Sequence, residues 1–110
     1  MNSKINDKID EVEKYLKELD AITPYNFDEY LEIKTRAACE RYFEKIVEAI
    51  ADLAFLVIRE NKFKTPEEDK EAFESLRNEK VITSELCDKL KNAKGMKNIL
   101  LMNMEILTTM

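Results

Sequence analysis

The stretch LEIKTRAACERYFEKIVEAIADLAFLVI, residues 31–58, decides the fold of this sequence. It contains no glycine or proline, and its apolar residues recur at steps of three and four, which predicts one long helix. We expect this helix to run from about Phe27 to Asn61, because Asn26 can cap its start. Two of its faces are apolar. The first face consists of Leu31, Thr35, Ala38, Tyr42, Ile46, Ala49, Leu53 and Leu56, and the second of Ile33, Ala37, Phe43, Val47, Ile50, Ala54 and Ile58.

A helix that is apolar on two faces must be covered on both. A helix of the same chain can cover one face, and the other suggests a second copy of the protein. The preceding segment supplies a covering helix over Lys4–Ala21, which Thr23 and Pro24 end because the residue before proline avoids the helical conformation. Its apolar residues follow a spacing of coiled-coil type and are Ile5, Ile9, Val12, Leu16 and Leu19.

The C-terminal half contains signals for further helices. The sequence TPEE at residues 65–68 matches a capping box with proline at the first helical position, and it predicts a helix over Pro66–Arg77. Ser84 is expected to cap the next helix. Gly95 either ends that helix or lies inside a kinked continuation. The apolar residues of this part are Leu86, Leu90, Ile99, Leu100, Leu101, Ile106 and Leu107.

The composition favours a single all-helical domain. A chain of 110 residues fits one domain, here residues 1–110, and 45% apolar with 37% charged residues is typical of a globular protein. One glycine and two prolines leave little material for turns, so the elements must be few and long. We therefore expect an all-α fold, an antiparallel bundle of four or five helices.

Several classes of active site are excluded by the residues that the sequence lacks. With no histidine, neither a Ser-His-Asp or Cys-His site nor a zinc site with imidazole ligands is possible. A single glycine rules out the usual phosphate-binding loops. Cys39 and Cys87 are isolated and are expected to be reduced thiols. We expect neither a metal nor a cofactor.

The chain is expected to be cytoplasmic. Its start, MNSKINDKIDEVEK, is charged from the fourth residue and does not resemble a signal peptide. The most apolar run, residues 46–58, contains Glu48 and Asp52 and is shorter than the roughly 20 residues that a membrane span needs.

A net charge of −5 argues against a surface that attracts nucleic acid everywhere, but it leaves room for a local basic patch. The segment KLKNAKGMK, residues 89–97, has four lysines and no acid, and Asn98 follows it. Lys89, Lys91, Lys94 and Lys97 are candidates for contacts to phosphate. In the alternative interpretation these cations only favour the end of a helix dipole.

Two segments together resemble a known family. RAACERYFEKIVEAIADLAFLVI (residues 36–58) and FESLRNEKVITSELCDKLKNAKGMKNILL (residues 73–101) are similar to the HepT-like branch of the HEPN domain. The resemblance implies a helical homodimer and a metal-independent ribonuclease toxin, paired with a small nucleotidyltransferase (MNT) antitoxin. Family members usually continue with another polar helix, whereas this sequence ends at Met110, so we expect a C-terminal helix that is short or missing.

The family signature is an arginine, four residues, a histidine, one residue and a tyrosine. In this sequence it falls on KNILLMNM, where Lys97, Met102 and Met104 occupy the three positions. A thioether has no proton to transfer, and lysine lacks the planar fork that grips phosphate. In the family the partner attaches a nucleotide to the tyrosine, and Met104 has no hydroxyl to accept one. The resemblance thus implies an impaired ribonuclease.

Two alternatives remain open at this point. The protein is either an unorthodox ribonuclease that uses Lys97 with neighbours such as Lys94 or Asn98, or a non-catalytic helical dimeric interaction module. The methionines near the C-terminus are expected to fill a core or an interface, at or beside a dimer contact. They are Met96, Met102, Met104 and Met110.

Overall fold

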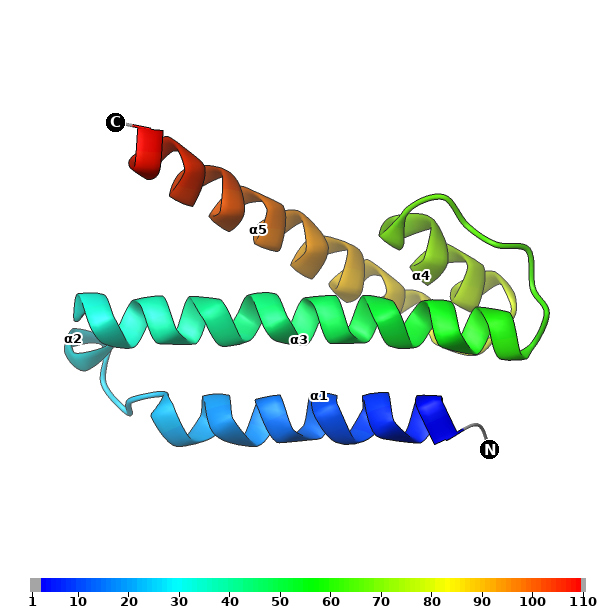
Figure 1. The fold of residues 1–110 in the computed structure, drawn as a ribbon, viewed down its shortest axis with the longest axis horizontal. Helices are drawn as coiled ribbons and strands as arrows, with labels where there is room; N and C mark the ends of the chain where they lie inside the picture. The colour runs from blue at the N-terminus through cyan, green and yellow to red at the C-terminus, as the bar shows by residue number, and fades with distance from the viewer. Residues whose placement is uncertain (1–2, 110) are drawn as a thin grey trace.

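The computed structural model describes the backbone of residues 3–109 and the side chains of residues 3–100. The described residues form helices and no strand, which confirms the expected all-α fold (Figure 1). The helices are α1 (Ser3–Ile22), α2 (Phe27–Tyr30), α3 (Ile33–Glu60), α4 (Asp69–Asn78) and α5 (Ser84–Thr109).

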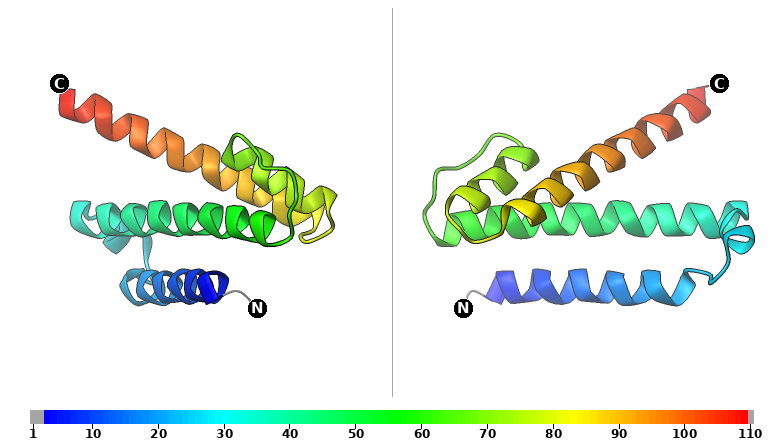
Figure 2. Two further views of the ribbon diagram at one scale, coloured as in Figure 1. Left: turned by 45° about the vertical axis from the view of Figure 1, so that its right-hand side comes forward. Right: turned by 180° about the vertical axis from the view of Figure 1, so that it is seen from behind.

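Helix α3 lies in the middle of the molecule. Helix α1 runs antiparallel along one side of it, and α4 and α5 cover the opposite side (Figures 1 and 2). Helix α5 crosses α3 obliquely, so their distance increases toward the C-terminus. Helices of the same chain therefore cover both apolar faces of α3 along its C-terminal half. A second copy is not needed there, contrary to the expectation from the sequence.

The main core lies where the C-terminal half of α3 meets α4 and the start of α5. Phe73, Ile58 and Cys87 are its largest fully buried side chains. Burying an aliphatic or aromatic side chain of this size contributes about 1.5–3 kcal/mol. Small residues of α3 and α4 let the helices approach closely. The buried cluster consists of Ala51, Ala54, Ile58, Ala72, Phe73, Leu76 and Cys87. As expected, Cys39 and Cys87 are both free thiols.

The contact between α1 and α3 is partly polar. The Tyr42 hydroxyl donates a hydrogen bond to Glu18 at 2.6 Å, and this bond raises the pKa of Tyr42 above its ordinary value. The Lys45 ammonium lies 5.6 Å from the ring centre of Tyr15 and 5.4 Å from that of Tyr42. Leu16, expected in an apolar seam, is instead 49% exposed. The expectation is wrong because α1 turns Tyr15 and Glu18 toward α3.

The long helix predicted over Phe27–Asn61 is interrupted near its start. Asn26 caps α2 as expected, since its side chain accepts a hydrogen bond from the Glu29 amide at 2.8 Å. The helix then stops, because Glu32, with φ −58° and ψ 133°, leaves the helical conformation. No glycine or proline marks this position, so periodicity alone could not locate the break.

The predicted start of the next helix is also wrong. Helix α4 begins at Asp69, after Glu68 in an extended conformation, and not at Pro66. The carboxylate of Glu71 accepts a hydrogen bond from the Glu67 amide at 3.0 Å. This bond is not the predicted capping box, because the residue that precedes α4 is Glu68 and the bond goes to the amide of Glu67, one residue earlier.

Helix α5 begins differently from the prediction. It also shows whether Gly95 ends the helix or lies inside it. Thr83 caps it in place of Ser84, because the Thr83 hydroxyl accepts a hydrogen bond from the Leu86 amide at 3.1 Å. The helix continues through Gly95, which has no positive φ. Gly95 is therefore an interior helical residue and not a C-terminal cap.

We expect Gly95→Ala to stabilise the protein by about 0.5–1 kcal/mol, because alanine loses less backbone entropy on forming a helix. A Cβ added at Gly95 meets no atom within 4 Å in the described structure. Urea denaturation of the two proteins measures the difference. Ala93→Gly in the same helix is the matched control and should destabilise by a similar amount. A lower stability of Gly95→Ala would show that position 95 is in close contact with another chain.

Candidate functional site

The family signature lies in the second half of α5. Lys97 faces α3, is only 6% exposed, and its Nζ lies 3.6 Å from the Oε1 of Glu48. Met102 and Met104 follow along the same helix, and their side chains are outside the described residues. The signature position with a charged side chain is thus buried and paired within the chain.

All four lysines of residues 89–97 form ion pairs. Three of their partners come from other helices, Asp69 and Glu74 from α4 and Glu48 from α3, so the acid-free run of the sequence is neutralised in space. The N···O distances are 3.1 Å for Lys89–Glu85, 3.4 Å for Lys91–Glu74, 2.8 Å for Lys94–Asp69 and 3.6 Å for Lys97–Glu48. A phosphate at any of these lysines would compete with a carboxylate already in place.

The pair between Lys94 and Asp69 is the shortest of the four and joins α5 to α4. The hydrogen bond to Asp69 raises the pKa of Lys94 above its ordinary value, while burial opposes the rise. Because the folded-state pKa is raised, the stabilisation is complete below the unfolded pKa of about 10.4 and is lost as pH rises through the folded value. The pair therefore holds α5 against α4 at neutral pH.

The pair between Lys97 and Glu48 joins α5 to α3 and is asymmetric. The lysine side chain is 8% exposed, whereas the glutamate side chain is 57% exposed. One helical turn earlier, Glu44 is 3% exposed, and its Oε2 lies 3.3 Å from the Nη1 of Arg41. The sequence places Glu44 and Glu48 on one face of α3, but it gave no sign that Glu44 is buried.

Two of the candidate residues share a pocket. Lys94 and Asn98 line a shallow pocket of about 350 Å³ together with Glu68, Asp69 and Lys70. Asn98 is exposed, and Lys94 is bound to Asp69 in the wall. Two acids and two lysines give this pocket no net charge, so it offers phosphate no excess of positive charge.

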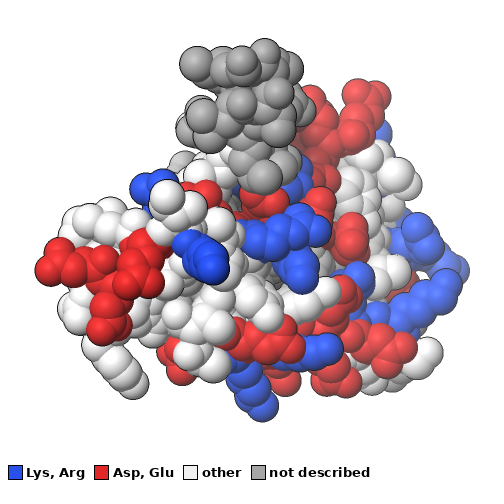
Figure 3. Space-filling view, turned by 60° about the vertical axis from the view of Figure 1, so that its left-hand side comes forward, with Lys and Arg blue, Asp and Glu red and all other residues white. Residues whose placement is uncertain are grey.

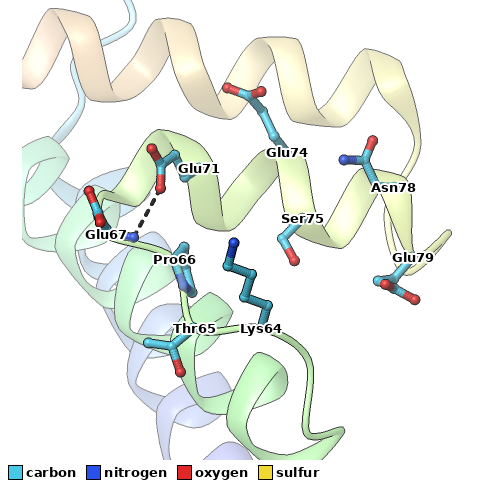
Figure 4. A pocket seen from close by; sticks show the side chains of 9 residues that line it. All are labelled: Lys64, Thr65, Pro66, Glu67, Glu71, Glu74, Ser75, Asn78 and Glu79. Carbon is cyan, nitrogen blue, oxygen red and sulfur yellow. Dashed lines mark hydrogen bonds between the residues drawn. The ribbon is translucent and has the colours of Figure 1, made fainter.

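A second pocket, which the sequence did not indicate, lies between α4 and the loop before it (Figure 4). Its volume is about 490 Å³, and Lys64 points into it from the loop. Carboxylates dominate the rest of its wall, which would repel a nucleic acid. Within the part of the chain that the structure describes, no three cysteine or carboxylate side chains are grouped to hold a metal ion. The lining residues are Lys64, Thr65, Pro66, Glu67, Glu71, Glu74, Ser75, Asn78 and Glu79.

These observations define an all-α domain in which the first signature position, Lys97, is buried and paired with Glu48. The profile of the family described as Ribonuclease HepT-like matches residues 12–103, and the chain belongs to this family. No curated protein matches the sequence significantly. Among residues 3–109, no helix has the length and apolarity that crossing a membrane requires.

Solved structures share the fold. A tri-AMPylated Shewanella oneidensis HEPN toxin in complex with an MNT antitoxin superposes with a TM-score of 0.85 at 23% identity, covering 91% of this chain and 75% of that one. A toxin–antitoxin with AMP-PNP gives 0.84 at 22% identity, covering 91% and 76%. A mutant of the toxin–antitoxin MntA-HpeT gives 0.84 at 21% identity, covering 98% and 86%.

We expect the ion pair between α5 and α3 to respond asymmetrically to substitution. Glu48→Gln leaves the buried Lys97 ammonium without a counter-charge and should cost about 1–3 kcal/mol. Lys97→Met leaves a glutamate that water can solvate and should cost less than about 1 kcal/mol. Urea denaturation at neutral pH measures both values.

The control is Glu85→Gln, because the Lys89–Glu85 pair is exposed on both sides. It should change stability by less than about 0.5 kcal/mol. Equal losses for Glu48→Gln and Glu85→Gln would contradict a buried role for Lys97.

Proposed function

We propose that this chain is the HEPN component of a toxin–antitoxin pair, that it has lost ribonuclease activity, and that it acts in the cytoplasm by binding an MNT-type nucleotidyltransferase. The observation that carries the proposal is the Lys97–Glu48 pair, which neutralises the charge remaining at the signature positions. Family membership and the shared fold with toxins in MNT complexes support the choice of partner.

Loss of activity follows from the chemistry of RNA cleavage. A group must move the proton of the attacking 2′-hydroxyl, and such positioned acid–base catalysis contributes typically about 10²–10⁴-fold. Methionine at position 102 has no proton to give or take. Charge must also stabilise the pentavalent phosphorus. Lys97 lacks the bidentate geometry of arginine, and Glu48 already balances its charge.

The same reasoning applies to covalent silencing by the partner. Met104 stands where the family has the tyrosine that accepts a nucleotide. A thioether cannot form the phosphodiester link, so this position has no acceptor. The partner is then retained for the complex itself and not for control of a nuclease.

A homodimer through the outer face of α5 is part of the proposal. Met96 and Ile99 are each 57% exposed on this helix, while Lys97 and Leu90 face the rest of the chain. Because 57% exposure excludes Met96 from the core of its own chain, an interface role fits it better. The apolar residues of α5 therefore point both inward and outward, which suits a helix that packs against a second copy.

The purified protein should not degrade RNA above a no-protein control, because Met102 has no proton to transfer and the charge of Lys97 is paired with Glu48. The double variant Lys97→Arg with Met102→His should gain cleavage. Fluorescent single-stranded RNA separated on a denaturing gel measures both. Wild-type cleavage that disappears in Lys97→Ala would overturn the proposal in favour of an unorthodox ribonuclease.

We expect Ile99→Asp to convert the dimer into a monomer, since a buried interfacial carboxylate without a partner is costly. Sedimentation velocity at micromolar concentration measures the species present. Leu16→Asp is the matched control, because Leu16 is an exposed apolar residue of α1, and it should leave the dimer intact. A wild-type protein that sediments as a monomer would contradict the dimer.

A further inference from the structure

The corner between α1 and α3, which we define as residues 18–33, exposes an unusual number of large apolar side chains. Tyr25 is fully exposed at 108%, Ile33 is 77% exposed and Phe27 is 70% exposed. Leu31 and Ile22 add to them at 46% and 38%. All five lie within residues 22–33, which include the loop before α2 and α2 itself. Exposed apolar side chains at this density are typical of a protein interface.

The same corner contains the whole net charge of the protein. Residues 18–33 include five of the 23 acidic residues and none of the 18 basic ones, so the rest of the chain is balanced and the −5 lies here. The five acids are Glu18, Asp20, Asp28, Glu29 and Glu32. Figure 3, which brings this end forward, shows acidic side chains grouped beside white surface at the left of the view.

The corner lies at the end of the molecule toward which the signature segment of α5 runs. Helix α2 and the C-terminal end of α5 lie at the same end of the molecule in every view (Figures 1 and 2). A protein bound to the corner would therefore lie at the end of the molecule toward which α5 runs after Lys97. The opposite end holds the connector between α4 and α5.

We propose that the corner, residues 18–33, is the docking surface for the nucleotidyltransferase, and that it fits a partner surface with an apolar centre and a rim of lysine and arginine. The inference rests on the proposed function, which supplies the partner but not the surface. Apolar side chains provide the buried area, and the acids select a basic rim and speed the encounter.

The charge of the corner favours the nucleotidyltransferase over a second copy of the chain as the protein that binds there. A two-fold symmetric contact places the same patch of both subunits together. It would bring the same five acids of each subunit together, and of these Glu18 pairs with Lys14, while the segment between Lys17 and Lys34 contains no base. Such like-charge contact disfavours self-association here. The outer face of α5, with no such excess of acid, remains the dimer surface.

The experiment measures binding of the purified chain to an MNT-type nucleotidyltransferase from the same genome, by isothermal titration calorimetry at two salt concentrations. Phe27→Ala with Ile33→Ala should weaken binding by at least about tenfold, the loss expected for central interface residues. Asp28→Lys with Glu29→Lys should weaken it similarly and reduce its dependence on salt. These side chains are exposed in the described structure, so the variants should fold.

The matched controls lie at the opposite end. Val81→Ala removes an apolar side chain that is 48% exposed, and Glu79→Lys reverses an exposed acid. Both should bind like the wild type. Corner variants that also bind like the wild type would overturn the docking surface while leaving the partnership intact.

Two other outcomes overturn the inference in distinguishable ways. Corner variants that lose the dimer in sedimentation velocity but keep their affinity for the nucleotidyltransferase would assign the corner to a second copy. A wild-type chain that does not bind the nucleotidyltransferase would refute the proposed function, and the docking surface with it.

Discussion

The fold depends on the burial of two opposite faces of one 28-residue helix, α3. On one side, tyrosine rings, carboxylates and Lys45 of the α1 contact combine apolar area with hydrogen bonds. On the other side, alanines of α3 admit Phe73 of α4 and Cys87 of α5 into a dense core. Among the described residues, α1 makes no contact with α4 or α5, so α3 connects the two sides. Loss of α3 would therefore release both.

Because α5 crosses α3 obliquely, the first signature position, Lys97, takes part in the contacts between the helices. Lys94 and Lys97 point at acids of α4 and α3, and these pairs hold α5 where it crosses the other two helices. A lysine that stabilises a helix crossing in this way is not free to bind a phosphate. The structural role and the proposed loss of catalysis are thus two consequences of one arrangement of charge.

The functional surfaces proposed here lie outside that arrangement. The outer face of α5 is apolar without an excess of charge, and the α1–α2 corner is both apolar and acidic. Their different electrostatics support the two proposed partners, a second copy for the first surface and a basic protein for the second. In the proposed function, binding of partners persists although ribonuclease activity is lost.

The sequence by itself determined the helical class, the end of α1 at Thr23–Pro24, the Asn26 cap and the family, because these depend on local periodicity, backbone restriction and short motifs. Only the tertiary structure decided the break at Glu32, the rotation that exposes Leu16, and the partners of the lysines of residues 89–97. Asp69 and Glu48 lie more than twenty residues from the lysines they neutralise. Such ion pairs form only where helices cross, so they cannot be read from the order of residues along the chain.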